Sequence, residues 1–229
     1  MYGSFGKRVL DILLSLLGLM ILSPLLLVLT VTGTAALGGN PFFRQIRPGR
    51  GEQLFWMVKF RSMTNEKDAA GRLLPDALRL TGYGRFLRET SLDELPELWN
   101  VLVGDMSLVG PRPQLVRDMV FMTMDQRRRH LVRPGITGLA QVSGRNGICW
   151  EEKLDFDLRY IETISFCEDL RILLETFRRV WMRDGICAEG MDTAEDLGDW
   201  LLRTGRVGQA EYAQKQFLAE AVLHRGKRR

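Results

Sequence analysis

The chain has 229 residues, of which 45% are hydrophobic and 26% charged, so it has an ordinary globular composition and can bury a core. Its formal net charge of +4 favours anionic partners such as phosphates, nucleotides or an acidic membrane surface. Its 3 cysteines contain no C-x-x-C pair, which excludes a zinc finger and a dense disulfide framework, and its 2 histidines, His130 and His224, leave almost nothing for a His-rich metal site or a Ser-His-Asp triad. The chemistry must therefore rest on carboxylates, cations or a bound hard metal.

An uncharged segment lies near the N-terminus. Residues 12–43 contain no charged side chain, and residues 12–31 are almost wholly apolar. About 20 helical residues are enough to cross a hydrocarbon core of about 30 Å. The segment can be a signal peptide, a simple spanning anchor, or a re-entrant helix that enters and leaves the membrane on one face.

Proline and charge favour the re-entrant helix. Pro24, directly after Ser23, removes a backbone donor in the middle of the segment, and the Ser23 hydroxyl can serve a carbonyl that this leaves free. Asp11 lies three residues after Arg8, a spacing that predicts an ion pair between them. Basic residues stand on both sides of the segment, namely Lys7, Arg8, Arg44, Arg47 and Arg50. This arrangement predicts that both ends of the segment are cytoplasmic.

The remaining pattern predicts an α+β, mostly helical fold. Two aromatic-rich runs, 42–46 and 54–60, flank a Pro/Gly turn and indicate a small β-hairpin. Helical spacing extends over 76–88, 91–102 and 150–181, whereas 110–113 and 133–146 have the composition of loops. Two amphipathic helices are expected at about 193–203 and 209–223. We therefore expect a membrane helix in 1–40, a cytoplasmic catalytic domain in 41–190 with interfacial helices, and a C-terminal helical extension in 191–229.

Asp93 and Glu94 are adjacent carboxylates at the start of a predicted helix. Ser91 and Glu94 fit a capping box, and Asp93 alone would fit an N-cap with Pro96 in the first turn. The same position also suits a phosphoryl site, because a helix start attracts phosphate, one carboxylate can act as nucleophile and another can hold Mg²⁺. The sequence leaves both interpretations open, and they are compatible.

Cations occur in or beside the predicted turns, helix starts and loops. Arg112 stands between Pro111 and Pro113, which restrict its backbone, and Arg145 follows a glycine that permits close approach of a ligand. The run Arg127–His130 looks instead like a solvated helix face or a contact with lipid headgroups. No pattern typical of a nucleic-acid-binding module is present, so nucleic acid is not expected as a partner.

The motifs resemble those of the bacterial monotopic phosphoglycosyl transferases, which are also called bacterial sugar transferases. The resemblance covers about residues 1–190 and is closest to the small members that load N-acetylated sugars such as diacetylbacillosamine for protein glycosylation. The motifs are Ser23-Pro24, KFRSM at 59–63, SLDELP at 91–96, NVL at 100–102, GDMS at 104–107, VGPRP at 109–113, RPGITG at 133–138 with Gln141-Val142, and GRN at 144–146.

The resemblance implies a reaction and a site. Asp93 would attack a UDP-sugar, release UMP and carry the phosphosugar, which undecaprenyl phosphate would then accept at the cytoplasmic face of the bacterial inner membrane. Glu94, with Asp93, would hold Mg²⁺. The residues expected to bind substrate are Lys59, Arg88, Arg112, Arg145, Asp157 and Asp169, with Asp155 as a further polar candidate. Phosphoryl transfer depends on positioning and charge neutralisation, so the scarcity of histidine is no obstacle.

Two other functions remain open at this point. A glycosyltransferase that moves the sugar without its phosphate would release UDP, and a non-catalytic membrane scaffold would explain the anchor but not the paired carboxylates. The sequence does not identify the sugar or the glycoconjugate pathway. The segment from Met191 onward lies beyond the resemblance, so we expect the chemical step to survive its deletion, with some loss of stability. It is a reasonable packing or homodimer element.

Overall fold

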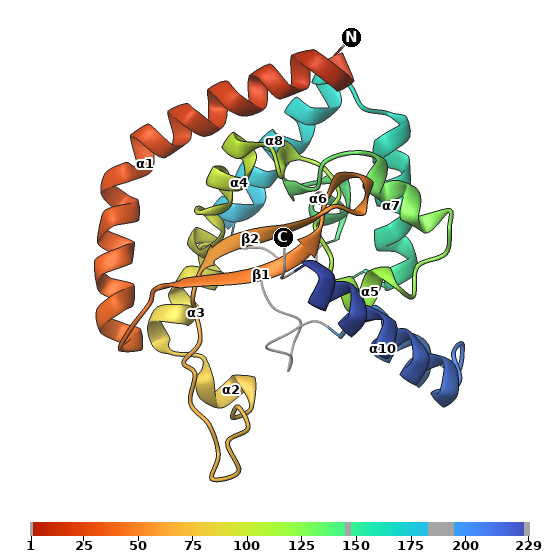
Figure 1. The fold of residues 1–229 in the computed structure, drawn as a ribbon. Coiled ribbons are helices and arrows are strands. Elements are labelled where there is room, and N and C mark those ends of the chain that lie inside the picture. Colours follow the sequence, from red (N-terminus) through yellow and green to blue (C-terminus); the bar gives the residue numbers. More distant parts are fainter. Residues whose placement is uncertain (1, 145–147, 183–194, 227–229) are drawn as a thin grey trace.

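The computed structural model describes residues 2–144, 148–182 and 195–226, and the fold is mostly helical with two small sheets (Figure 1). The predicted α+β, mostly helical class is confirmed. The helices and strands in chain order are α1 (Lys7–Leu37), β1 (Phe42–Pro48), β2 (Leu54–Phe60), α2 (Asp76–Arg79), α3 (Gly82–Glu89), α4 (Glu97–Val103), β3 (Ser107–Val109), α5 (Val116–Met119), β4 (Gly135–Thr137), α6 (Leu139–Ser143), α7 (Trp150–Glu162), α8 (Phe166–Met182), α9 (Leu197–Arg203) and α10 (Gln209–Gly226). Short helical turns, η1 to η4, cover Tyr2–Gly6, Arg50–Glu52, Leu92–Glu94 and Gln126–Leu131.

Helix α1 is bent but not interrupted. It contains Pro24 and curves around the rest of the fold, with a clear bend partway along its length (Figure 1). Proline at position 24 cannot donate to the carbonyl of Met20 four residues earlier. The Ser23 hydroxyl donates to that carbonyl at 2.8 Å, which confirms the expected local donor. The bend is therefore accommodated without leaving the Met20 oxygen unpaired.

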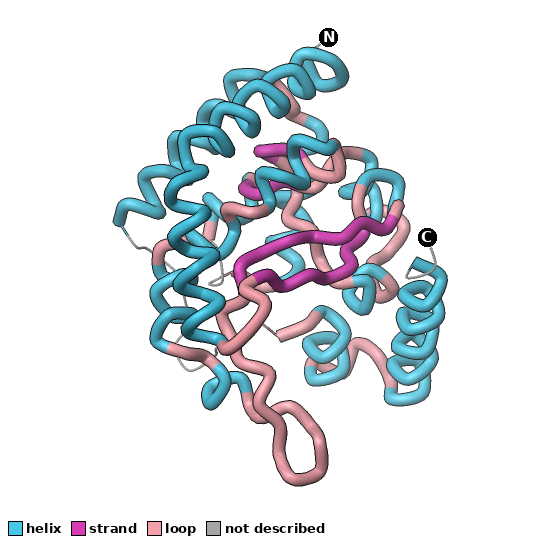
Figure 2. The backbone as a smooth tube through the Cα atoms, turned by 60° about the vertical axis from the view of Figure 1, so that its left-hand side comes forward, coloured by secondary structure: helices cyan, strands magenta, loops and turns pink. Residues whose placement is uncertain are grey.

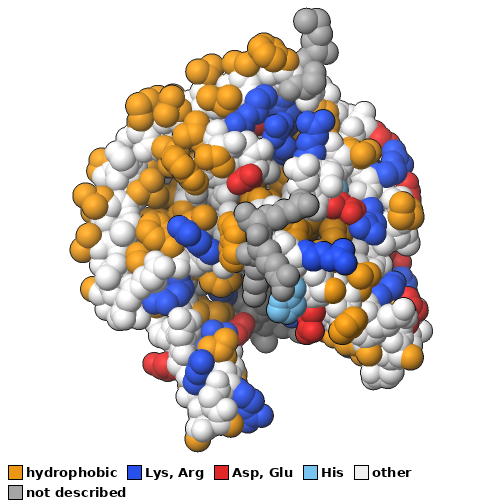
Figure 3. All heavy atoms as spheres, in the orientation of Figure 1, with side chains coloured by type: hydrophobic (Ala, Val, Ile, Leu, Met, Phe, Trp, Pro, Cys, Tyr) orange, Lys and Arg blue, Asp and Glu red, His pale blue; other side chains and the backbone are white. Residues whose placement is uncertain are grey.

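The outward surface of α1 is apolar. Only 11% of its most apolar stretch is buried, and exposed side chains such as Leu13, Met20 and Leu27 cover it (Figure 3). By length and composition this helix could cross a membrane, which agrees with membrane association. A re-entrant path with both ends on one face is not tested by the fold and stays a prediction.

The N-terminal end of α1 is fastened to the C-terminal end of α4. The Arg8 guanidinium donates to the carbonyls of Val101 and Leu102 at 2.6 and 2.8 Å. A cation at this end satisfies carbonyls that the helix leaves unpaired and opposes its negative pole. The membrane helix is thereby tied to a short helix of the remaining fold.

The predicted ion pair between Arg8 and Asp11 is wrong. The Asp11 carboxylate is buried and accepts hydrogen bonds from the Ser107 hydroxyl at 3.0 Å and the Leu108 amide at 2.9 Å. Both side chains are used for tertiary contacts across about ninety residues of chain, which helical spacing alone does not reveal. Arg8 thus docks α1 onto the end of α4, and Asp11 docks it onto the start of β3.

The two sheets are of different kinds. The predicted hairpin is confirmed: β1 and β2 are antiparallel, with Phe42 opposite Phe60 and Pro48 opposite Leu54. The second sheet pairs β3 with β4 in parallel; the sequence indicated a loop where β4 lies and no element for residues 107–109. Strands of three residues are too short to show alternation. A Cβ on Gly110 would lie 2.5 Å from a carbonyl oxygen, so only glycine permits this close approach.

The predicted long helices are each divided. The segment 76–88 forms α2 and α3, 91–102 forms η3 and α4, and 150–181 forms α7 and α8. The Arg127–His130 run differs from its interpretation as a solvated face, because Arg129 and His130 are buried. Arg127 makes a two-point contact with Glu52, at 2.6 and 2.5 Å. Arg129 and His130 thus lie in the interior instead of facing solvent, and burial lowers the pKa of His130 to about 4, so this histidine is neutral at pH 7.

The C-terminal extension belongs to the same core as the rest of the chain. Helices α9 and α10 match the expected segments closely; both contact α5, and α10 also lies against the hairpin (Figure 2). Leu197 packs with Phe121 and Leu154, and Ala219 packs with Ile46. The described part of the extension is therefore a packing element, and survival of the chemical step after its deletion stays a prediction. The homodimer remains untested.

The bend in α1 yields a prediction about topology. Replacing Ser23 and Pro24 together with leucine and alanine should straighten the helix into a spanning one, because the backbone donor is restored. A single cysteine at position 3, in a background without native cysteines, reports topology through an impermeant thiol reagent applied to whole cells. We expect labelling only in the double variant, with Thr32→Leu as a control. If the cysteine at position 3 were labelled from outside in the protein that keeps Ser23 and Pro24, the re-entrant path would be ruled out.

Candidate active site

A buried lysine joins two acidic side chains. Strand β2 places Lys59 opposite η3 and the start of α4, where its ammonium lies 2.8 Å from Glu94 Oε1 and 2.9 Å from Glu97 Oε1. The Glu97 side chain is only 1% exposed and that of Lys59 14% exposed. Buried charges need partners of opposite sign, and the Lys59 ammonium serves as the partner of both carboxylates. This cluster is the centre of the candidate site.

Asn100 holds α4 against β2 so that the cluster can form. Its side-chain amide donates to the Trp56 carbonyl at 2.8 Å and its oxygen accepts from the Val58 amide at 3.1 Å. The Asn100 side chain thus satisfies a backbone carbonyl and a backbone amide of β2 in the way that a neighbouring strand would. Neither Glu97 nor Asn100 was among the predicted site residues, although their spacing of three and six residues from Glu94 is a helical signal that could have found them.

Arg112 approaches the same carboxylate from the loop after β3. Its guanidinium forms an ion pair with Glu94 Oε1, and its own carbonyl accepts a hydrogen bond from Arg129 at 2.5 Å. Arg129 in turn pairs with the buried Asp157 at 2.8 Å. Asp157 thus contacts the site indirectly, by holding the arginine that holds the Arg112 backbone.

Arg88 reaches the site from α3. Its Nε donates to the Ser62 hydroxyl at 3.0 Å. Helix α3 lies directly on the backbone of Ser62, since a Cβ on Gly84 would come within 1.7 Å of the Ser62 carbonyl oxygen. The positive charge of Arg88 lowers the pKa of Asp93, behind larger effects of burial and of closer charges. The structure therefore brings Lys59, Arg88 and Arg112 together around the two adjacent carboxylates.

The adjacent carboxylates do not serve as helix caps. Ser91 has a left-handed backbone with φ of 55° and no capping hydrogen bond from its side chain, so the predicted capping box is wrong. Asp93 lies inside η3, and α4 begins only after Pro96. Among the residues that the structure describes, no hydrogen bond or ion pair engages the Asp93 carboxylate. It is thus available to a ligand.

Burial and charge push the pKa values of this pair apart. Burial, followed by the neighbouring Glu94 charge, raises the pKa of Asp93 to about 6. Burial would also raise the pKa of Glu94, but the cations of Arg112 and Lys59 outweigh it and hold that pKa well below its usual range. Two carboxylates whose environments differ in this way can take different chemical roles.

The other predicted residues lie elsewhere. Asp169 is buried in α8 and accepts from Tyr2 at 2.6 Å and Tyr160 at 2.7 Å, besides its ion pair with Lys7. It anchors the N-terminus and is not part of the Lys59 cluster. Asp155 is exposed on α7. Arg145 lies outside the described residues.

The donor set allows a magnesium ion only with help from a substrate. Within the described ranges, no group of three or more acidic, histidine or cysteine side chains could form a metal site. Neither oxygen of Asp93 has a hydrogen-bond or ion-pair partner in the part of the chain that the structure describes, and Glu94 uses Oε1 for its two cations. Mg²⁺ commonly binds one or two carboxylates together with phosphate oxygens and water. The residues therefore fit an ion that arrives with a diphosphate.

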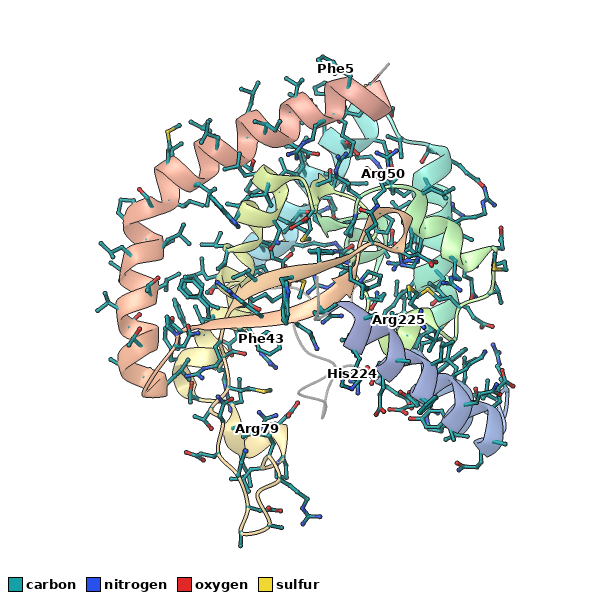
Figure 4. All side chains as sticks on the ribbon, viewed as in Figure 1. Phe5, Phe43, Arg50, Arg79, His224 and Arg225 are labelled. Atoms are coloured by element: carbon teal, nitrogen blue, oxygen red, sulfur yellow. The ribbon has the colours of Figure 1, made fainter. Side chains whose placement is uncertain are left out.

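A cavity of about 590 Å³ lies away from this cluster, at the turn of the hairpin. Arg50 and Arg133 line it together with Gly104, and Figure 4 shows Arg50 at that end of the hairpin. Arg133 donates to the Gly104 carbonyl at 2.8 Å and so joins Arg8 in satisfying the end of α4. The lining contains none of the carboxylates of the Lys59 cluster, so this cavity is not the candidate active site.

The chain was compared with known families and proteins. The family model described as bacterial sugar transferase matches residues 2–183. The chain belongs to the bacterial sugar transferase family. The match includes every described residue of the Lys59 cluster and ends before α9.

Its relatives include small and large proteins. The chain is 46% identical to a Bacillus subtilis protein named uncharacterized sugar transferase EpsL, over 82% of this chain and 94% of the relative. It is 42% identical to the undecaprenyl-phosphate galactose phosphotransferase of Salmonella typhimurium and 41% to the UDP-glucose:undecaprenyl-phosphate glucose-1-phosphate transferase of Klebsiella pneumoniae. These matches cover 79% and 74% of this chain, but only 41% and 39% of the two larger relatives.

The cluster predicts a large effect of removing its lysine. Lys59→Met should destabilise the protein by about 3–5 kcal/mol, because two buried carboxylates lose their shared cation. The loss should be smaller at pH 5 than at pH 8, since unpaired carboxylates can then take up protons. Thermal unfolding in detergent measures both effects, with the exposed Lys67→Met as control. Equal stability of the two variants would contradict this account of the cluster.

Proposed function

We propose that this protein transfers a sugar-1-phosphate from a UDP-sugar to undecaprenyl phosphate and releases UMP. Family membership and the activities for which the Salmonella and Klebsiella relatives are named support the general reaction. The observation that carries the proposal is the Asp93 carboxylate, which has no hydrogen-bond or ion-pair partner among the described residues, beside a Glu94 that pairs with two cations. This arrangement suits attack on an electron-poor phosphorus in a positive environment.

The reaction proceeds in two displacements. A carboxylate oxygen of Asp93 forms a bond to the sugar-bearing phosphorus, and the bond from that phosphorus to the bridging oxygen breaks, which releases UMP with the electron pair. A phosphate oxygen of undecaprenyl phosphate then attacks the same phosphorus and frees the Asp93 carboxylate. At a pH above their pKa values, the Asp93 carboxyl group and the lipid phosphate are both already ionised. Neither nucleophile therefore needs a general base such as histidine to remove a proton.

The cations bind and orient the diphosphate. Arg112 is 39% exposed at its side chain, which leaves part of its guanidinium accessible beyond the pair with Glu94. Lys59 is held between two carboxylates and contributes its charge mainly by fixing Glu94. A bound Mg²⁺, held by Asp93 and Glu94 with substrate oxygens, would neutralise charge on the leaving phosphate.

The membrane helix suits a lipid acceptor. We place the site at the cytoplasmic face of the bacterial plasma membrane, where UDP-sugars and the lipid phosphate meet. The donor sugar is proposed to be N-acetylated, as the resemblance implies, and a donor screen must include UDP-glucose and UDP-galactose because the named relatives act on those sugars. The product would enter glycoconjugate assembly, as the name of the exopolysaccharide production protein ExoY of Sinorhizobium fredii indicates for that relative.

The nucleophile is tested by trapping the intermediate. With UDP-sugar alone, the unaltered protein should gain the mass of one phosphosugar and release one equivalent of UMP, and Asp93→Asn should do neither. Intact-protein mass spectrometry with nucleotide analysis measures this, with the exposed Asp125→Asn as control. An adduct in Asp93→Asn would place the nucleophile elsewhere, and UDP as product would support the alternative glycosyltransferase. Activity unaffected by EDTA would remove Mg²⁺ from the proposal.

The raised pKa of Asp93 predicts an acid limb in the rate profile. Because the attacking group must be ionised, kcat/KM should rise with pH through about 6 and level off above it. Arg112 lowers the pKa of Asp93, so Arg112→Gln should move this limb to higher pH as well as slow the reaction. Rates measured from pH 5 to 9 for both proteins decide this. A limb that does not move would mean that the two side chains do not interact electrostatically.

A further inference from the structure

We propose that the C-terminal helices α9 and α10 hold the Arg112 loop in its binding geometry, with buried Asp118 as the positioning residue. The proposal rests on the proposed function, because it takes Arg112 as a ligand of the diphosphate. It concerns a part of the chain that lies beyond residue 183, where the family match ends. It assigns that part a role in donor binding.

The Arg112 loop connects β3 to α5 and is held at several points of its backbone. Arg129 donates to the Arg112 carbonyl, and Arg47 donates to the Pro113 carbonyl at 3.2 Å. Both contacts come from the family region and lie near the arginine itself. The far end of the loop is held differently, through α5.

Asp118 joins the end of this loop to the extension. Its side chain is buried, at 2% exposure, and its two oxygens have separate partners. Oδ2 accepts from the Leu115 amide at 3.0 Å, and Oδ1 accepts from the Leu197 amide at 2.9 Å. Leu115 is the last residue before α5, and Leu197 is the first residue of α9. One carboxylate thus links two segments about eighty residues apart.

Other contacts fix the same junction. Asp196 pairs with Arg117 at 2.6 Å, and the Trp150 indole donates to the Glu195 carbonyl at 3.0 Å. Gly198 lies so close to Phe121 that an added Cβ would come within 2.5 Å of the ring. The start of α9 therefore has little freedom relative to α5 and α7.

Helix α5 depends on these neighbours for its position. It has only 4 residues, and a helix of one turn is not stable by itself. Val116 and Met119 of α5 share a core with Ile46 of β1 and Ala219 of α10. The last turn of α10, which carries His224 and Arg225, lies beside the hairpin, and Gly226 abuts Leu54 (Figure 4). The extension thus covers α5 and braces it against the strand that also contacts Pro113.

Small movements of the loop matter because Arg112 must meet two groups at once. It pairs with Glu94 on η3 while its remaining donors are left for the substrate. A displacement of about 1 Å at a binding group can cost about a hundredfold in rate. A loop anchored at one end only would sample such displacements.

The test uses Asp118→Asn in the full chain. Asparagine has the size of aspartate, but only its one oxygen can accept a hydrogen bond, so one of the two backbone amides loses its acceptor. We expect KM for the UDP-sugar to rise by about tenfold in UMP release, with a smaller change in kcat. Tyr212→Phe is the matched control: it removes a hydrogen bond between α10 and Asp199 of α9 at 2.5 Å without touching Asp118, and its KM should be unchanged. Asp196→Asn, a milder change at the same junction, should raise KM in the same direction.

A double-mutant cycle separates positioning from general stability. If Asp118 acts through Arg112, Asp118→Asn should add nothing to the defect of Arg112→Ala. Independent, multiplying effects, or an unchanged KM in a folded Asp118→Asn, would overturn the proposal. Should Asp118→Asn not fold, the same cycle with Asp196→Asn decides the question. Failure of the proposed function is distinguishable, because the unaltered protein would then release no UMP.

Discussion

The shared position of Lys59 between Glu94 and Glu97 is the constraint on which the site depends. Two carboxylates at this depth would repel each other and resist ionisation, and one ammonium at 2.8 and 2.9 Å makes their charges tolerable. Lys59 can reach both carboxylates only if β2 lies beside α4. Asn100 holds the two elements together through its contacts with the Trp56 and Val58 backbones. Glu94 is held by cations on both sides, whereas its neighbour Asp93 has no hydrogen-bond or ion-pair partner among the described residues.

Much of the fold and part of the site could be predicted from the sequence. Local signals sufficed for the hairpin, for the C-terminal helices and for the Ser23 hydroxyl that serves the Met20 carbonyl. The parallel pair of β3 and β4 could not be predicted, because three-residue strands carry no alternation. The docking of Asp11 on the start of β3 joins segments distant in the chain and leaves no local pattern.

The contrast between local signals and contacts between distant segments also explains which predicted site residues lie in the site. Lys59, Arg88, Arg112, Asp93 and Glu94 come from four separate segments, namely β2, α3, η3 and the loop after β3. The family resemblance predicted that they form one site, and the structure places them together. Asp157 and Asp169 were chosen on the same grounds, but burial gives them internal partners, Arg129 for the first and two tyrosines with Lys7 for the second. A charged residue that is predicted to bind substrate can instead hold a residue of the site, as Asp157 does through Arg129, or lie away from the site, as Asp169 does. Only the contacts in the structure distinguish these possibilities from direct binding.

Helix α4 connects the membrane helix to the chemistry. Its C-terminal carbonyls receive Arg8 from α1, and its N-terminal turn carries Glu97 beside Lys59. Val101 and Leu102 follow Glu97 by four and five residues, so at about 1.5 Å per residue the helix separates the two contacts by about 6–8 Å. An ordinary loop in this place would let that separation vary. Under the proposed reaction, the short rigid helix keeps the Asp93 carboxylate at a constant depth relative to α1, and hence to the surface at which a lipid phosphate would present itself.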